Sequence, residues 1–151
     1  MAPKRGSEFI MLLILLAAQI IPAGEIFRCT PTRVWDGDGP VWCAEGPRLR
    51  IAGIAAREAN GTCRSNQPCP SATAEQARDA LVAVVGTRRG VAREGHILVN
   101  GPTMTCRSDG GARGSRTAAW CTSPRSGDVS CAMVQSRTVL VWQRYWRDHR
   151  C

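Results

Sequence analysis

Two aspartates, an arginine and a glutamate are spaced so that one small site could hold all four. The aspartates lie in the turn Asp36-Gly-Asp38-Gly, between two apolar segments. Because glycine tolerates the positive φ of tight turns, a β-hairpin is the simplest interpretation. Arg50 and Glu58 follow on the next segments. Carboxylates suit a hard cation and arginines suit a phosphate, so the pattern indicates chemistry on a phosphate group.

The segment after the turn predicts a strand that presents its arginines together. Arg48-Leu-Arg50-Ile alternates charged and apolar residues. On a strand, Leu49 and Ile51 face one way while Arg48 and Arg50 face the other. A further short apolar run carries the chain to Glu58. Each piece also has a structural interpretation, since Asp and Gly are ordinary hairpin formers and a lone arginine on a strand is usually solvated.

In order and spacing, these pieces resemble the staphylococcal-nuclease-like (thermonuclease) family. The family pattern is roughly DGDT, then RLxGIDxPE, then YGRxxA, and its last part is matched here by Gly114–Ala118, GSRTA. The resemblance covers most of the chain from about Ile26 to Tyr145. It implies an α+β protein, a small OB-fold five-stranded β-barrel with about two packed helices. It also implies a calcium-dependent nuclease that hydrolyses phosphodiester bonds of DNA or RNA.

The resemblance also assigns a role to each residue. Ca²⁺ is held by Asp38, and by Asp36 through water. Glu58 is the general base toward a water, and Arg50 and Arg116 stabilise the charge on phosphorus and on the leaving oxygen.

The chain departs from the family pattern at several positions. Ala55 replaces the second metal-binding aspartate and Arg57 replaces the proline; Gly39 stands for the threonine of DGDT, and Gly114 for a tyrosine on which a base could stack. One lost carboxylate weakens calcium binding, and Arg57 adds a positive charge beside the site. The alternative is a catalytically inactive OB-fold module that binds nucleic acid or another polyanion. A third hypothesis is a disulfide-rich envelope protein that contacts a partner.

The first residues predict export. A basic segment, Met1–Arg5, precedes the apolar run Phe9–Ile21 and the small residues Pro22-Ala23-Gly24. A helix over this run reaches about 20 Å, short of the roughly 30 Å hydrocarbon core. We therefore predict a signal peptide over residues 1–23 and one domain over 24–151, secreted or periplasmic, without stable membrane insertion after cleavage. An uncleaved anchor or a buried strand is the alternative.

The charge favours polyanionic partners. The formal net charge is +8, and Lys4 is the only lysine, so arginines carry the positive charge of the predicted domain. Nucleic acid, an anionic polysaccharide or a membrane surface would suit this balance, and we expect nucleic acid as the partner of a monomer.

Eight cysteines, all after the predicted signal peptide, indicate disulfides. Cys63 with Cys69 and Cys106 with Cys121 are the expected local pairs. A structural zinc site is the alternative, although no C-x-x-C pair occurs and the histidines are two, His96 and His149.

Two helices are predicted. Ser71–Val85 has a Thr73-x-x-Gln76 capping box and one apolar face, and Asp128–Arg137 begins at a capping aspartate. Strands are expected over Ile26–Val34, 96–100 and 103–107, whereas Thr87–Gly95 is predicted as a loop and Ser108 as the start of a glycine-rich turn.

The C-terminal tail, Gln143–Cys151, interleaves aromatic residues with arginines. Trp142 and Trp146 are four residues apart, and we interpret them as closing the core, with Cys151 held by a disulfide. The alternative is that Trp142, Tyr145 and Trp146 stack nucleobases while arginines neutralise phosphates.

Overall fold

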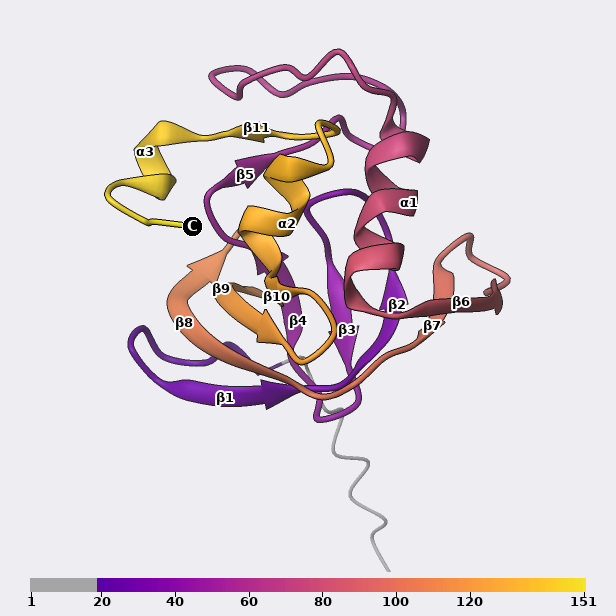
Figure 1. Ribbon diagram of the computed structural model, residues 1–151, viewed down its shortest axis with the longest axis vertical. Coiled ribbons are helices and arrows are strands. Elements are labelled where there is room, and N and C mark those ends of the chain that lie inside the picture. Colours follow the sequence, from indigo (N-terminus) through magenta and orange to yellow (C-terminus); the bar gives the residue numbers. More distant parts are fainter. Residues whose placement is uncertain (1–18) are drawn as a thin grey trace, which may run out of the picture.

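The computed structural model describes residues 19–151, and within them it shows an α+β fold (Figure 1). A curled, mixed β-sheet is packed against helices, which confirms the predicted class. The predicted signal peptide falls largely on residues 1–18, outside the described part.

The main sheet has nine strands: β1 (Ile26–Cys29), β2 (Pro31–Val34), β3 (Val41–Cys43), β4 (Arg48–Ile51), β6 (Thr87–Val91), β7 (Ile97–Asn100), β8 (Met104–Ala112), β9 (Arg116–Ser123) and β10 (Gly127–Asp128). A two-stranded sheet pairs β5 (Ile54–Ala55) with β11 (Leu140–Val141). The helices of the described part are α1 (Ala74–Val85), α2 (Val129–Gln135) and α3 (Gln143–Trp146).

One parallel pairing joins the two halves of the sheet. The strand order is β1-β8-β9-β4-β3-β2-β7-β6, with β10 beside β9. All neighbours are antiparallel except β4 and β9, where Arg50 lies opposite Ala118. This register places Arg50 beside the segment that begins at Arg116, although 65 residues separate the two in the sequence.

The apolar faces of the sheet and of two helices enclose the core. In Figure 1, α1 and α2 lie over the curled sheet, and their buried faces meet the strands. The largest fully buried side chains include Leu49, Ile51, Leu81, Met104 and Met133. Because burying one such side chain contributes roughly 1.5–3 kcal/mol, the core holds β4 and β9 firmly in place.

Both predicted helices form, with their predicted caps. The Thr73 side chain accepts from the Gln76 backbone, and Gln76 reaches back to the Thr73 backbone, so the capping box is complete. The Asp128 side chain accepts from the backbone N–H of Cys131 at 2.8 Å and caps α2. Each helix is shorter than predicted, since α1 begins at Ala74 and α2 ends at Gln135.

The strands are more numerous than the five expected. The prediction of a loop over Thr87–Gly95 is wrong, because Thr87–Val91 forms the edge strand β6 against β7. The predicted glycine-rich turn does lead into a strand, but it begins later than Ser108: β8 continues to Ala112, with a bulge between Ser108 and Gly110, and the turn occupies residues 113–115. Pairing with β9 across that bulge keeps the glycine-rich segment extended.

All eight cysteines form disulfides. The predicted pairs Cys63–Cys69 and Cys106–Cys121 are confirmed, and the others are Cys29–Cys43 and Cys131–Cys151. With no free cysteine on the chain, a zinc site with thiolate ligands is excluded. Four disulfides favour a compartment outside the cytoplasm. Among residues 19–151, no helix has the length and apolar character needed to cross a membrane.

The stretch just before β1 contacts the sheet. Ile21 donates its backbone N–H to the Thr117 hydroxyl at 3.0 Å and accepts from the Ser108 hydroxyl at 2.7 Å. The last residues assigned to the signal peptide thus lie along β8 and β9.

Candidate functional site

Four of the five predicted site residues line one cavity. Its volume is about 780 Å³, and Asp38, Arg50, Glu58 and Arg116 all contribute to its wall. We call it the arginine-lined cavity, because its other charged lining residues are Arg64, Asp109, Arg113 and Arg147. The fifth predicted residue, Asp36, is buried outside the lining, with 5% of its surface exposed.

The acidic turn is held by its own backbone and by β4. The N–H of Asp38 contacts an Asp36 carboxyl oxygen at 3.3 Å, and its carbonyl accepts from Ile51 N–H at 2.8 Å. Gly39 has φ +115°, and a Cβ there would overlap the Leu49 carbonyl. A threonine, as in the family pattern, does not fit this backbone.

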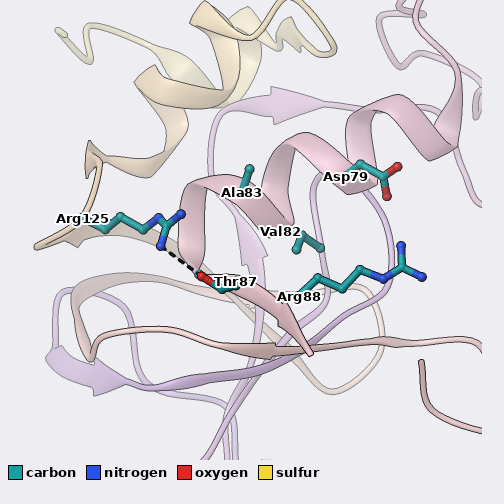
Figure 2. A pocket seen from close by; sticks show the side chains of 7 residues that line it. Asp79, Val82, Ala83, Thr87, Arg88 and Arg125 are labelled. Atoms are coloured by element: carbon teal, nitrogen blue, oxygen red, sulfur yellow. Dashed lines mark hydrogen bonds between the residues drawn. The ribbon is translucent and has the colours of Figure 1, made fainter. Parts of the chain in front are cut away.

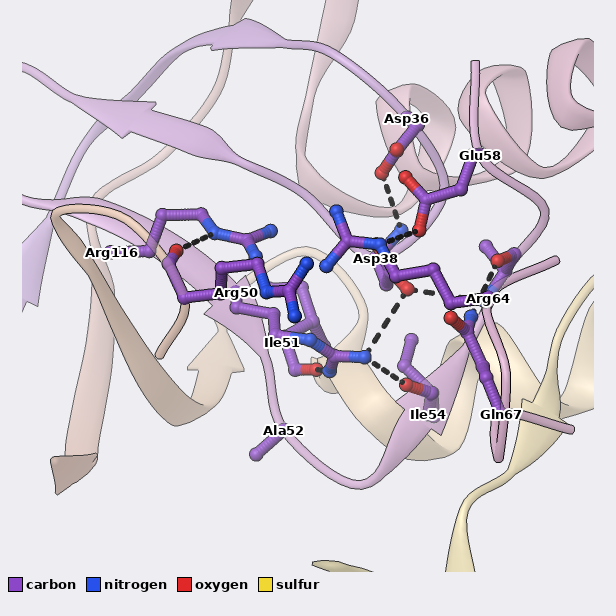
Figure 3. A network of polar contacts seen from close by, with 12 residues as sticks. Asp36, Asp38, Arg50, Ile51, Ala52, Ile54, Glu58, Arg64, Gln67 and Arg116 are labelled. Atoms are coloured by element: carbon purple, nitrogen blue, oxygen red, sulfur yellow. Dashed lines mark hydrogen bonds and ion pairs between the residues drawn. The ribbon is translucent and has the colours of Figure 1, made fainter. Parts of the chain in front are cut away.

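The Asp38 carboxylate links the turn to Arg50 (Figure 3). Its Oδ2 accepts from the Ala56 N–H at 3.2 Å and lies 3.4 Å from Arg50 Nη2. The same guanidinium donates to the carbonyls of Ile51 and Ile54 at 3.0 and 3.1 Å. Arg50 thus clamps β4 to the β5 segment while it lines the cavity.

Acidic groups are concentrated around Asp38. Burial, and then repulsion from Asp38 and Glu58, raise the pKa of Asp36 to about 9. Figure 3 shows the Asp36 and Glu58 carboxyl groups beside each other. A cation near these groups would relieve the repulsion, which is the electrostatic property expected of a metal site.

Glu58 pairs with an arginine that the sequence analysis did not select. Arg64 Nε lies 3.0 Å from Glu58 Oε1, and the two side chains are 43% and 27% exposed. The pair is open to solvent at the cavity wall. The signal for Arg64 was its place inside the short Cys63–Cys69 loop, next to a residue that is fixed by a disulfide.

Arg116 reaches the same space from the start of β9. Its Nε donates to the Arg113 carbonyl at 2.8 Å, which orients the guanidinium. Partial burial and then the charge of Arg50 lower the pKa of Arg116 from its usual value. In Figure 3, the guanidinium groups of Arg50, Arg64 and Arg116 converge from different sides. Such a cluster of cations favours an anionic ligand.

The aromatic residues of the C-terminal segment differ in their surroundings: one packs against the core, and two line the cavity. Trp146 packs against the core and meets the Trp120 ring edge-on at 5.7 Å, as the core interpretation predicts. Trp142 and Tyr145 instead line the arginine-lined cavity. The Trp142 N–H donates to the Gly53 carbonyl at 2.7 Å and fixes this segment.

Two departures from the family pattern have structural explanations. Ala55 is fully buried in β5 and pairs with Leu140 of β11. Arg57 does not line the cavity; it donates to the carbonyls of Pro70 and Gly61 at 2.8 and 3.0 Å. The expectation that its charge lies beside the site is therefore replaced by a role in holding the loop.

The carboxylates partly fit a calcium ion. Asp38 and Asp36 offer hard oxygen ligands, but the raised pKa of Asp36 keeps that carboxyl protonated at neutral pH, so it would have to lose its proton when a cation binds. In the part of the chain that is described, the one group of three ligand-type side chains within 4.8 Å of one another is Asp128, Cys131 and His149. This group does not suit a metal, because the Cys131 sulfur is bonded to Cys151.

A second hollow lies between the end of α1 and β6 (Figure 2). It has about 320 Å³, and its polar contact is Arg125 Nη1 to the Thr87 hydroxyl at 3.3 Å. None of the predicted site residues lies there, so the arginine-lined cavity is the candidate site.

Comparison with protein-family models, with curated proteins and with solved structures gives no match.

Proposed function

We propose that the protein is an exported nuclease, secreted or periplasmic, that hydrolyses phosphodiester bonds of DNA or RNA with the help of calcium, on an OB-like barrel. The observation that supports it most is that Asp38, Arg50, Glu58 and Arg116, distant in sequence, line one cavity. The resemblance of their motifs to the thermonuclease pattern is the second support.

The arginines bind and stabilise the reacting phosphate. Arg50 and Arg116 donate hydrogen bonds to its non-bridging oxygens, and these bonds strengthen as negative charge builds on the pentacoordinate phosphorus. Arg50 is held by three acceptors, so little reorganisation is needed when the substrate binds.

Glu58 acts as the general base. It accepts a proton from a water molecule whose oxygen forms the new bond to phosphorus, while the bond to the leaving oxygen breaks and that oxygen is protonated by solvent. The Glu58–Arg64 pair at 3.0 Å has to open first. A bound phosphate can replace Glu58 as the anionic partner of Arg64, which frees the Glu58 carboxylate.

Asp38, with Asp36 through water, is the proposed ligand set for calcium. When bound, the ion supplies positive charge that polarises the phosphate. Because Ala55 offers no carboxylate, we expect weaker binding than a site with a third aspartate would give.

The test is cleavage of single-stranded DNA and RNA by the purified disulfide-bonded protein in millimolar calcium. Glu58→Gln should lower the rate by roughly 10²- to 10⁴-fold, through loss of the base. Arg116→Ala should lower it by roughly 10²- to 10³-fold, through loss of a donor to the phosphate. Exposed residues away from the cavity give matched controls, Glu75→Gln on α1 and Arg89→Ala on β6. If the wild-type protein leaves both substrates intact over hours, the proposal fails.

A non-catalytic module that binds a polyanion is the second candidate. It is favoured because the proposed metal ligand and the proposed base are already paired with arginines: Arg50 contacts Asp38, and Arg64 contacts Glu58. Binding to single-stranded DNA would then be salt-sensitive and would persist with a chelator and in Glu58→Gln. Loss of binding when calcium is chelated would count against this candidate.

A further inference from the structure

The arginine-lined cavity has an aromatic wall as well as a charged one. Trp142 and Tyr145 line it together with Arg116. Their rings meet edge-to-face at 4.8 Å, and Tyr145 is 41% exposed. The cavity thus combines cations for a phosphate with an accessible ring for a planar group.

Core packing does not account for the Tyr145 ring. Trp146 fills the core-facing position of this segment, where Gly53 leaves room for the rings of Trp120 and Trp146. Tyr145 is among the few large hydrophobic side chains that remain exposed in the described part. The Arg144 guanidinium lies 5.5 Å from the centre of this ring, and the exposed part of the ring remains open to a ligand in the cavity.

Trp142 fixes the aromatic wall next to the phosphate-binding end. Its backbone is bonded to Gly53, and the Arg50 guanidinium lies 5.5 Å from the centre of its ring. Arg50 also contacts Asp38, so the aromatic and charged walls share one residue. A ligand that contacts both walls has to carry an anionic group and a flat group a short distance apart.

The charge and size of the cavity agree with such a ligand. Five arginines and three acidic residues line it, so its wall is cationic. Its volume of about 780 Å³ lies within the roughly 300–1,000 Å³ that is usual for small-molecule sites. A nucleotide has both required groups, a phosphate and a planar base.

We infer that Tyr145, backed by Trp142, is a base-stacking subsite that selects single-stranded nucleic acid for the arginine-lined cavity. The inference deepens the proposed function and rests on it, since both place a nucleic-acid phosphate at Arg50 and Arg116. Stacking on an aromatic side chain contributes about 1–3 kcal/mol per base and tolerates any base. In a duplex the base faces are covered, so an unpaired strand is the preferred ligand.

The sole tyrosine of the chain provides a direct readout. In protein labelled with ¹³C on its tyrosine ring, every tyrosine signal comes from Tyr145. Adenosine 5′-monophosphate and ribose 5-phosphate are titrated in the presence of a chelator, so that neither calcium nor bond cleavage is involved. A stacked base should move the ring signals upfield through its ring current, whereas the sugar phosphate should leave them nearly unchanged.

Matched substitutions at Tyr145 complete the test. Tyr145→Leu should weaken binding of the nucleotide roughly 5- to 150-fold and leave that of ribose 5-phosphate unchanged. Tyr145→Phe keeps the ring and should retain the affinity. Because the side chain is exposed, neither change should unfold the protein.

The outcomes separate the subsite from the nuclease. Three results would overturn the subsite. The two probes could shift the Tyr145 signals equally, or the nucleotide could fail to bind. The third is that Tyr145→Leu binds the nucleotide as tightly as the wild type does. If the protein cleaves nucleic acid and any of these results is obtained, the proposed nuclease function is kept and the Tyr145 subsite is rejected. Stacking on Tyr145 without cleavage would support the subsite and point to a binding module.

Discussion

Burial and neighbouring carboxyl groups make the ionisation of Asp36 unfavourable. Asp36 is buried beside Asp38 and near Glu58, and its pKa is raised to about 9. Such an arrangement costs stability at neutral pH unless a cation offsets it.

Asp36→Asn should therefore stabilise the protein in the absence of calcium. In the folded state the carboxyl holds its proton up to about pH 9, whereas in the unfolded state it loses it near pH 3.9. Between these values the folded state binds more protons, so the contribution of Asp36 to stability falls as pH rises. At pH 8 the variant should be more stable by on the order of 1–2 kcal/mol, with a smaller gain at pH 5. Urea unfolding at both pH values measures the difference.

Calcium should reverse that advantage. A ligand of the folded state stabilises it in proportion to its affinity, so millimolar calcium should raise the unfolding midpoint of the wild type more than that of Asp36→Asn. Asp79→Asn, on the exposed face of α1, is the matched control and should behave as wild type. A variant at Asp36 that is less stable than wild type at pH 8 would contradict the electrostatic argument.

At the scale of elements, a disulfide-closed loop forms one wall of the site. Cys63–Cys69 closes it, Gln67 donates to the Ala56 carbonyl at 2.8 Å, and Arg57 bonds to Pro70. These contacts hold Arg64 at the wall of the cavity that Arg116 also lines. The loop has no regular structure of its own, so its position depends on these ties.

Replacing both cysteines of that loop by serine should affect the site more than the fold. Removing a short cross-link costs about 2 kcal/mol by loop entropy. Because Arg64 is then less well fixed, affinity for ribose 5-phosphate should fall roughly two- to five-fold. Calorimetric titration measures it. The matched control is Cys106→Ser with Cys121→Ser, which removes a link between β8 and β9. A larger loss of phosphate affinity in that control than in the loop variant would contradict the assignment.

At the scale of the whole molecule, local features could be predicted from the sequence and distant pairings could not. The acidic hairpin turn, the buried Leu49 and Ile51, the α1 capping box and the two local disulfides follow from neighbouring residues. The edge strand β6 was missed because its residues, TRRGV, show no apolar alternation. The parallel contact of β4 with β9, which joins Arg50 to the Arg116 segment, was not predicted; the resemblance implied only that the two arginines act on one phosphate.

The aromatic wall also depends on long-range contacts that no local pattern encodes. The chain enters the tail from β11, which lies beside β5 (Figure 1). The tail is then joined to α2 and its capping residue by the Cys131–Cys151 disulfide and by the contact of His149 Nε2 with Asp128 at 2.8 Å. The His149 ring stacks on Trp120 at 3.9 Å. The position of Tyr145 is therefore set by contacts on both sides of it in the chain.

Releasing the end of the tail should remove the aromatic wall together with Arg147 and leave the other arginines of the charged wall in place. In Cys131→Ser with Cys151→Ser, loss of the cross-link should cost about 3 kcal/mol of stability. The freed segment should sharpen the ring signals of Tyr145 and reduce the preference for adenosine 5′-monophosphate over ribose 5-phosphate. Affinity for the sugar phosphate should persist, because Arg50, Arg64 and Arg116 lie outside the tail. Unchanged preference in this variant would mean that β11 and Trp146 alone position Tyr145, whereas loss of both affinities would show that the tail supports the whole cavity.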